Sequence, residues 1–252
     1  MKKLLFLFFF YVIATSAQNT LIDEWEANIG YINVQGDFGE RSVFSSTLPN
    51  SGAVFGAKVY FNLLDPYRGA GRYFKFPLGL NVGFTNLSYS KAYEDYPPSA
   101  SLEKLKAING QLFFANLNVG AEYHLTDLRS FNVFTSNFFS KFDPYVGLGA
   151  GVSFYNVDIE SDLGNYERDP SILPVPLQGR VFSGPGIEPF VNLEIGLRYQ
   201  FSTDLLLNIS NKWNYYLLSD RVDGIQPKEN MVDNRSNDWF FYPTLGVVIF
   251  IY

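Results

Sequence analysis

The 252-residue sequence contains no cysteine and a single histidine, His124. The lack of cysteine excludes disulfide bridges, cysteine-ligated metal sites and the lipid anchor of a lipoprotein, which needs a cysteine just after its cleavage site. Apolar runs of 18 residues are also missing, so the sequence predicts no membrane-spanning helix. Positive charge is in deficit, and the formal net charge of −6 argues against a nucleic-acid partner.

Aromatic residues, in contrast, are abundant. Phe, Tyr and Trp make up 18% of the chain, with 25 Phe and 17 Tyr, yet the mean hydropathy is close to zero. Many aromatic residues in a chain of average polarity favour segments in which apolar and polar residues alternate. A period of two is typical of β-strands, because successive side chains point to opposite faces.

Eight segments show this alternation over about ten residues or more, the length that a tilted strand needs to cross a bilayer. They are residues 24–34, 53–63, 78–89, 111–124, 145–155, 190–200, 205–217 and 238–252. The sequence therefore predicts an all-β fold, an eight-stranded antiparallel up-and-down transmembrane β-barrel.

The polar face of these segments carries glycine, asparagine and a balanced set of charges. Three charged residues are acidic and three are basic: Glu26, Lys58, Glu122, Glu194, Arg198 and Lys212. An eight-stranded barrel is so narrow that side chains fill its interior. Because buried charges must be paired, we predict that these six residues form a charge network in the lumen.

Two soluble folds remain as alternatives. In a β-sandwich the polar face would meet water, but solvent-facing strands usually favour Thr, Lys and Glu over repeated Gly and Asn. A lipocalin-like barrel would be apolar inside and polar outside, so its aromatic residues would have to face inward.

The N-terminal segment has the layout of a secretory signal peptide. Two lysines precede ten apolar residues at 4–13, and small residues follow up to Ala17, after which we place the cleavage. Residues 1–17 are then the signal peptide and residues 18–252 the barrel. An uncleaved anchor is the alternative, but ten apolar residues span only about half of a ~30 Å hydrocarbon core.

The last predicted strand ends in an aromatic residue. Counting back by twos, we predict one lipid-facing side with aromatic residues near both ends: Tyr252, Phe250, Val248, Gly246, Thr244 and Tyr242. A strand that ends in this way resembles the signal by which bacterial outer-membrane barrels are recognised for insertion. Val248, Phe250 and Tyr252 are the predicted insertion signal, and the location expected is the outer membrane with both termini in the periplasm.

This orientation makes 36–52, 90–110, 156–188 and 218–237 outer loops, and 64–74, 125–143 and 201–204 periplasmic turns. The segment 125–143 is too long for a simple turn. It predicts either an extra short strand pair or an amphipathic patch on the inner leaflet. The proline-rich stretch 172–177 predicts a contact surface or a lid over the barrel, with packing against neighbouring loops as the alternative.

Acidic residues gather in two of the outer loops, at Asp158, Glu160, Asp162, Glu167 and Asp169, and at Asp220, Asp223, Glu229, Asp233 and Asp238. Carboxylates bind Ca²⁺, but neither cluster has the spacing of a known calcium loop. Solvated or salt-bridged charge is therefore the favoured interpretation.

Catalytic and cofactor motifs do not emerge. The glycine run 147–151 lacks the third glycine of the dinucleotide fingerprint, since Val152 stands there and the strand alternation continues. His124 is expected at the periplasmic end of its strand, hydrogen-bonded to Glu122 or a neighbour, far from the outer leaflet where a lipid hydrolase would need it. We expect no enzyme activity, no cofactor and no metal site.

Five short segments carry a resemblance to a known family: 16–18, 36–41, 143–147, 215–224 and 237–239. On these the mature chain resembles the small outer-membrane β-barrel proteins of the Bacteroidota, in particular a largely uncharacterised flavobacterial family. More distantly it resembles the small barrel of the type IX secretion apparatus, from which the long 125–143 turn departs. The resemblance implies an eight-stranded barrel and no catalytic role, because no active site is known for the family.

The leading hypothesis is a structural or interaction role, either as a non-catalytic subunit of an envelope assembly or as a protein that binds through its surface loops. A small-solute pore or binding barrel is the second hypothesis, and a lipid-modifying enzyme the third. The expected partners are the outer membrane with its lipopolysaccharide, the barrel-insertion machinery and other envelope proteins.

Overall fold

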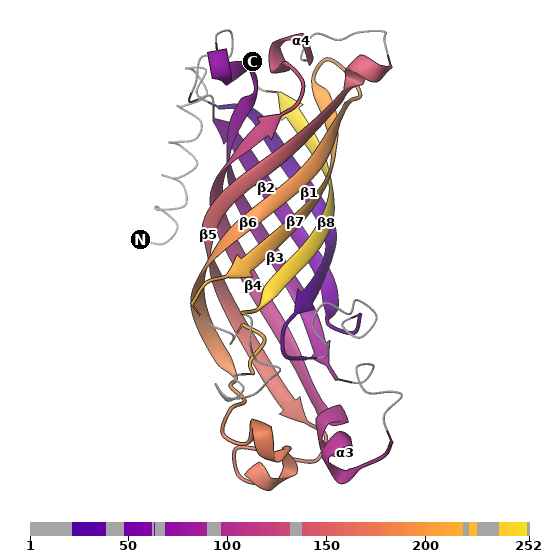
Figure 1. Ribbon diagram of the computed structural model, residues 1–252, viewed down its shortest axis with the longest axis vertical. Coiled ribbons are helices and arrows are strands. Elements are labelled where there is room, and N and C mark those ends of the chain that lie inside the picture. Colours follow the sequence, from indigo (N-terminus) through magenta and orange to yellow (C-terminus); the bar gives the residue numbers. More distant parts are fainter. Residues whose placement is uncertain are drawn as a thin grey trace, which may run out of the picture.

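The computed structural model describes residues 22–38, 48–61, 63, 69–89, 97–131, 138–218, 222–225 and 237–250. Within these residues, eight antiparallel strands follow one another around a closed barrel, and the first strand pairs with the last (Figure 1). The predicted fold class is confirmed. The signal peptide predicted at 1–17, its cleavage site and Tyr252 lie outside the described residues.

All eight predicted segments form strands. Their bounds are β1 Ile22–Gln35, β2 Ser51–Phe61, β3 Phe74–Ser88, β4 Ile108–His124, β5 Phe142–Ser161, β6 Gly184–Gln200, β7 Leu205–Tyr216 and β8 Trp239–Phe250. β5 and β6 are longer than predicted and take up both ends of the predicted loop 156–188. The reason is that the alternation continues there, with Val157 and Ile159 buried while Asp158 and Glu160 are exposed.

Short helices occupy the connections. They are η1 Gly69–Arg72, α3 Ala100–Lys106, α4 Leu128–Phe131, η2 Phe139–Lys141, η3 Pro170–Ile172 and η4 Val175–Leu177. Ser99 caps α3, because its side chain accepts a hydrogen bond from the Leu102 amide at 3.2 Å. None of the helices among the described residues is long and apolar enough to cross a membrane.

The connection between β4 and β5 corrects one prediction. Its described residues contain α4 and η2 instead of an extra strand pair, and Asp143 belongs to β5. A helical turn forms at 128–131 because it buries Leu128 and Phe131, which are 5% and 3% exposed. We refer below to the barrel end that carries this connection as the α4 end and to the opposite end as the α3 end (Figure 1).

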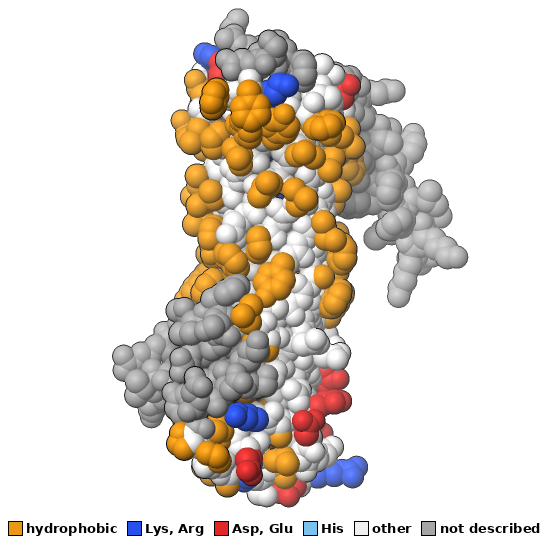
Figure 2. Space-filling view, turned by 90° about the vertical axis from the view of Figure 1, so that its right-hand side faces the viewer, with side chains coloured by type: hydrophobic (Ala, Val, Ile, Leu, Met, Phe, Trp, Pro, Cys, Tyr) orange, Lys and Arg blue, Asp and Glu red, His pale blue; other side chains and the backbone are white. Residues whose placement is uncertain are grey.

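The barrel is apolar outside and polar inside over most of its length. Outward-facing Leu148 and Ile209 are 66% and 62% exposed, whereas inward-facing Lys58 and Arg198 are 2% and 0% exposed. Figure 2 shows apolar side chains spread over the barrel wall and charged side chains near its two ends. A closed barrel of this polarity excludes both the sandwich and the lipocalin-like alternative, and it is the arrangement of a transmembrane β-barrel.

The face predicted for the last strand is wrong. Val248 and Tyr242 lie inside the barrel, 0% and 1% exposed, whereas Leu245 and Ile249 point outward at 55% and 51%. β8 is apolar on both faces, so alternation alone did not identify the lipid-facing side. Strand pairing shows which face of β8 points inward, because Val248 lies opposite Glu26 of β1, and the charged Glu26 side chain must face the lumen.

Aromatic and aliphatic side chains fill the lumen towards the α3 end. Phe114, Phe190 and Phe240 from the strands belong to one buried cluster with Leu173 and Leu177 from the loop between β5 and β6. Leu173 is only 1% exposed. The proline-rich stretch of this loop therefore packs on the cluster that closes the barrel, where it also meets neighbouring loop residues.

Candidate functional site

The six charged residues predicted to face the lumen lie inside the barrel, and the structure brings them together. Lys58 is central: its Nζ lies 2.6 Å from Glu194, 3.2 Å from Glu122 and 3.8 Å from Glu26. Each of these carboxylates comes from a different strand. One ammonium group therefore links β2 to β6, β4 and β1 across the lumen.

Arg198 is the second centre of the network. Its Nη1 donates to Glu24 Oε2 and its Nη2 to Glu122 Oε2, both at 2.9 Å. The guanidinium lies between two aromatic rings, 4.6 Å from the Tyr60 centroid and 5.3 Å from that of Tyr145. Two charge-assisted hydrogen bonds and two ring faces surround a side chain with no solvent exposure.

The remaining predicted members join through Glu194 and Glu26. Lys212 Nζ lies 3.3 Å from Glu194 Oε2, and the Tyr145 hydroxyl donates to Glu194 Oε1 at 2.9 Å. The Tyr60 hydroxyl donates to Glu26 Oε2 at 2.6 Å. Each carboxylate thus has several donors, as buried charges require.

Sequence reasoning missed part of this network. Glu24 and Lys75 are buried and form an ion pair, and Asp143 is fully buried. Glu24 has the same parity as Glu26 on β1, so alternation could have identified it. Lys75 and Asp143 were missed because β3 and β5 begin earlier than the apolar pattern indicates.

His124 lies at the α4 end of this network with no solvent exposure. Its Nδ1 is 2.6 Å from Asp143 Oδ2, its Nε2 is 3.6 Å from Glu122, and its ring stacks on Tyr145 at 5.3 Å. The Asp143 carboxylate also accepts a hydrogen bond from the Thr126 hydroxyl. These contacts tie the start of β5 to the end of β4.

Glycine makes room for the large side chains of the network. A Cβ on Gly196 would lie 2.2 Å from the Tyr145 ring, and one on Gly151 would lie 2.6 Å from Phe190. Neither distance is compatible with a side chain. The lumen is therefore packed with side chains at these levels.

Both ends of the lumen are covered in the described part of the chain. At the α4 end, Phe131 packs against Leu206 and Val248, with Phe250 alongside. At the α3 end, the apolar cluster closes the barrel. Clefts of about 380 and 280 Å³ lie instead at the α3 end of the strands, and both are lined by Asp158 and Glu160.

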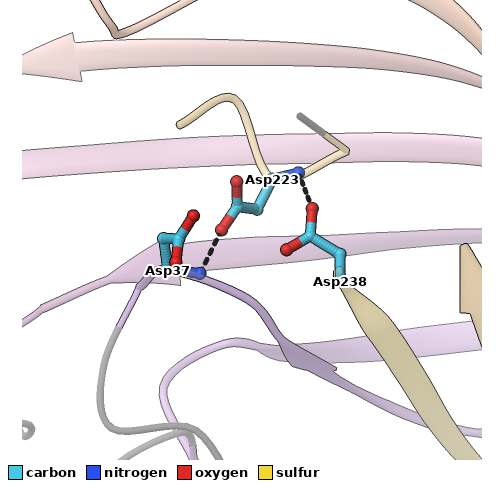
Figure 3. A group of neighbouring side chains, drawn as sticks. All are labelled: Asp37, Asp223 and Asp238. Carbon is cyan, nitrogen blue, oxygen red and sulfur yellow. Dashed lines mark hydrogen bonds between the residues drawn. The ribbon is translucent and has the colours of Figure 1, made fainter. Parts of the chain in front are cut away.

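Three carboxylates meet near the α3 end, two of them from a predicted acidic cluster. Asp37, Asp223 and Asp238 have carboxylate oxygens within 4.8 Å of one another (Figure 3). Backbone amides donate to two of the three carboxylates: Val222 donates to Asp238 at 3.0 Å, Ile225 donates to Asp223 at 2.9 Å, and the Asp37 amide also donates to Asp223. The arrangement ties the loop after β7 to the end of β1.

Comparison with known proteins adds a set of distant structural likenesses. No protein-family profile and no curated protein matches the sequence. Neisserial surface protein A is similar at a TM-score of 0.49 and 10% identity, covering 90% of this chain and 96% of its own. A major outer membrane protein of Thermus thermophilus is similar at a TM-score of 0.46 and 11% identity, covering 90% of this chain and 98% of its own. The N-terminal β-barrel domain of Pseudomonas aeruginosa OprF is similar at a TM-score of 0.36 and 16% identity, covering 89% of this chain and 96% of its own.

Proposed function

We propose that this protein is an integral outer-membrane β-barrel with a structural or interaction role, and that it is not an enzyme. The observation that carries the proposal is the polarity of the barrel. Paired charges fill the inside, and large apolar side chains such as Phe55 and Phe84 stand 51% and 57% exposed on the outside. Only a bilayer makes this exterior favourable.

The closed lumen favours interaction over transport. Arg198 and Lys58 hold carboxylates from opposite sides of the barrel, and α4 and the proline-rich loop cover its two ends. A barrel of this kind offers partners its loops and its outer wall. A non-catalytic subunit of an envelope assembly, or a barrel that binds through its surface loops, fits these features.

The orientation proposed has the α3 end outside the cell and the α4 end in the periplasm. Connections at the α3 end are long, as at 162–183, whereas β6 and β7 are joined at the α4 end by residues 201–204. Short periplasmic turns and long outer loops are typical of such barrels. We further propose that the predicted signal peptide directs export of the chain, that the insertion machinery delivers the barrel to the outer membrane, and that the barrel contacts lipopolysaccharide there. The proposed relatives are the small outer-membrane barrels of the Bacteroidota.

The experiment that tests the role is purification of a tagged copy from native outer membranes in gentle detergent, with identification of co-purifying proteins. A stoichiometric partner, retained after the membranes are washed at high salt, would support a subunit of an assembly. A second tagged barrel of similar abundance serves as the control for non-specific capture. A solitary, heat-modifiable monomer under every gentle extraction would refute the assembly version.

A small-solute pore or binding barrel is the second candidate, and one observation favours it. Between the charge network and the aromatic cluster the lumen is lined by amides, among them Asn28, Asn118 and Asn192, and the Asn192 Nδ2 has no protein partner. Such a layer suits a polar solute or water. Single-channel recording in planar bilayers separates the candidates, because absence of conductance steps would eliminate a pore.

A further inference from the structure

The connection between β4 and β5 presents apolar side chains in two directions. Leu128 and Phe131 of α4 are buried, and Phe131 packs on Leu206 and Val248 over the end of the lumen. This half of the connection is accounted for by the closure of the barrel. The half that leads into β5 is not.

Phe138 and Phe139 extend the outer surface of the barrel past the strand ends. Phe139 is 83% exposed and Phe138 is 58% exposed. The Phe138 ring lies 5.1 Å from Phe142, and Phe142 lies 5.1 Å from Tyr199. Phe142 and Tyr199 are outward-facing residues opposite each other on β5 and β6, so the stack is continuous with the apolar wall.

The chemistry of this stack suits one environment. Exposing so much of two phenylalanine rings to water is unfavourable, whereas aromatic rings are enriched where a bilayer meets water. Lys141 ends η2 directly beyond the two rings, and a basic residue beside aromatic ones is typical of segments that lie in the headgroup region of a membrane.

We propose that residues 138–142 form an interfacial anchor that docks on phospholipid headgroups of the periplasmic leaflet. The inference rests on the proposed function, because it takes the apolar wall as the membrane-spanning surface. It goes further by assigning a connecting segment outside the strands to the lipid. The anchor holds one end of the connection in the membrane while α4, at the other end, covers the lumen.

The absence of cysteine from the sequence makes a direct test simple. Ser140→Cys adds a labelling site beside the two rings without changing them. Leu148→Cys, in the middle of the outer wall of β5, reports the membrane span. Leu163→Cys, 52% exposed in a loop at the α3 end, reports an exposed apolar position away from lipid. Each variant carries the same environment-sensitive fluorophore.

The labelled proteins are reconstituted into phosphatidylcholine vesicles with bromine either high or deep on the acyl chains. We expect shallow bromine to quench the label at 140 at least twofold more than the label at 163. Deep bromine should quench the label at 148 most. Replacing Phe138 and Phe139 by serine should reduce the quenching at 140 to the level seen at 163.

The outcomes distinguish the anchor from the proposed function. Strong quenching at 148 with no more at 140 than at 163 would overturn the anchor and leave the membrane barrel intact. Quenching at neither 148 nor 140 would overturn the membrane barrel itself. Unchanged quenching at 140 in the double serine variant would also refute the anchor, because the two rings would then not be its cause.

Discussion

Replacing Arg198 by leucine should destabilise the barrel by about 3 kcal/mol. Arg198 has no solvent exposure and bridges Glu24 and Glu122 at 2.9 Å each. Breaking a buried ion pair by removing one partner costs about 3–5 kcal/mol. The lower end applies because Glu122 keeps Lys58 at 3.2 Å and Glu24 keeps Lys75, so neither carboxylate is left alone.

The assay is urea unfolding in lipid vesicles, followed by the fluorescence of the three tryptophans. Arg168→Leu, at an exposed position in the loop after β5, is the matched control and should leave the free energy of unfolding unchanged. Adding Glu122→Gln to Arg198→Leu should restore part of the loss, because it neutralises a carboxylate that has lost Arg198 while Lys58 keeps Glu194 at 2.6 Å and Glu26 at 3.8 Å. A free energy of unfolding within about 0.5 kcal/mol of wild type would refute the reasoning.

Three further changes test other features. Gly196→Val should abolish the heat-modifiable folded band on gels, because its Cβ would overlap the Tyr145 ring; a normal band would mean that Tyr145 can move aside. His124→Ala should leave lipid modification of the envelope unchanged in mass spectra, and loss of a modification would reveal a catalytic role. Deleting Tyr252 should lower surface levels in cells but not folding in detergent; normal surface levels would count against the predicted insertion signal.

Strand positions and the inward charges were predictable because both follow from a period of two. On β6, apolar Val191 and Leu193 alternate with polar Asn192 and Glu194, so the polar residues can be assigned to the lumen and the apolar residues to the outer wall. On β8 this contrast is missing, since Val247 and Val248 are alike, and only pairing with neighbouring strands distinguishes them. Alternation identifies a face only where the two faces differ in polarity.

Contacts between distant segments were beyond sequence reasoning for a different reason. Asp37, Asp223 and Asp238 meet because three chain segments converge at the α3 end, and no spacing along the chain reports this. The hydroxyl of Tyr60 was missed as a donor to Glu26 because the predicted lumen network included only charged side chains, although Tyr60 has the same parity as Lys58 on β2. The turn at α4 was missed because its burial depends on where the lumen ends.

The charge network also has a consequence for the order of folding. Arg198 and Glu24 are 174 residues apart in the chain, and Lys58 and Glu194 are 136 apart. Glu194 and Lys212 can pair within the hairpin of β6 and β7, but this hairpin, entering the bilayer alone, would carry Arg198 into a medium of low dielectric constant without its partners Glu24 and Glu122. Neutralisation requires both halves of the chain at once, so insertion should be concerted, with partly inserted intermediates too unstable to accumulate.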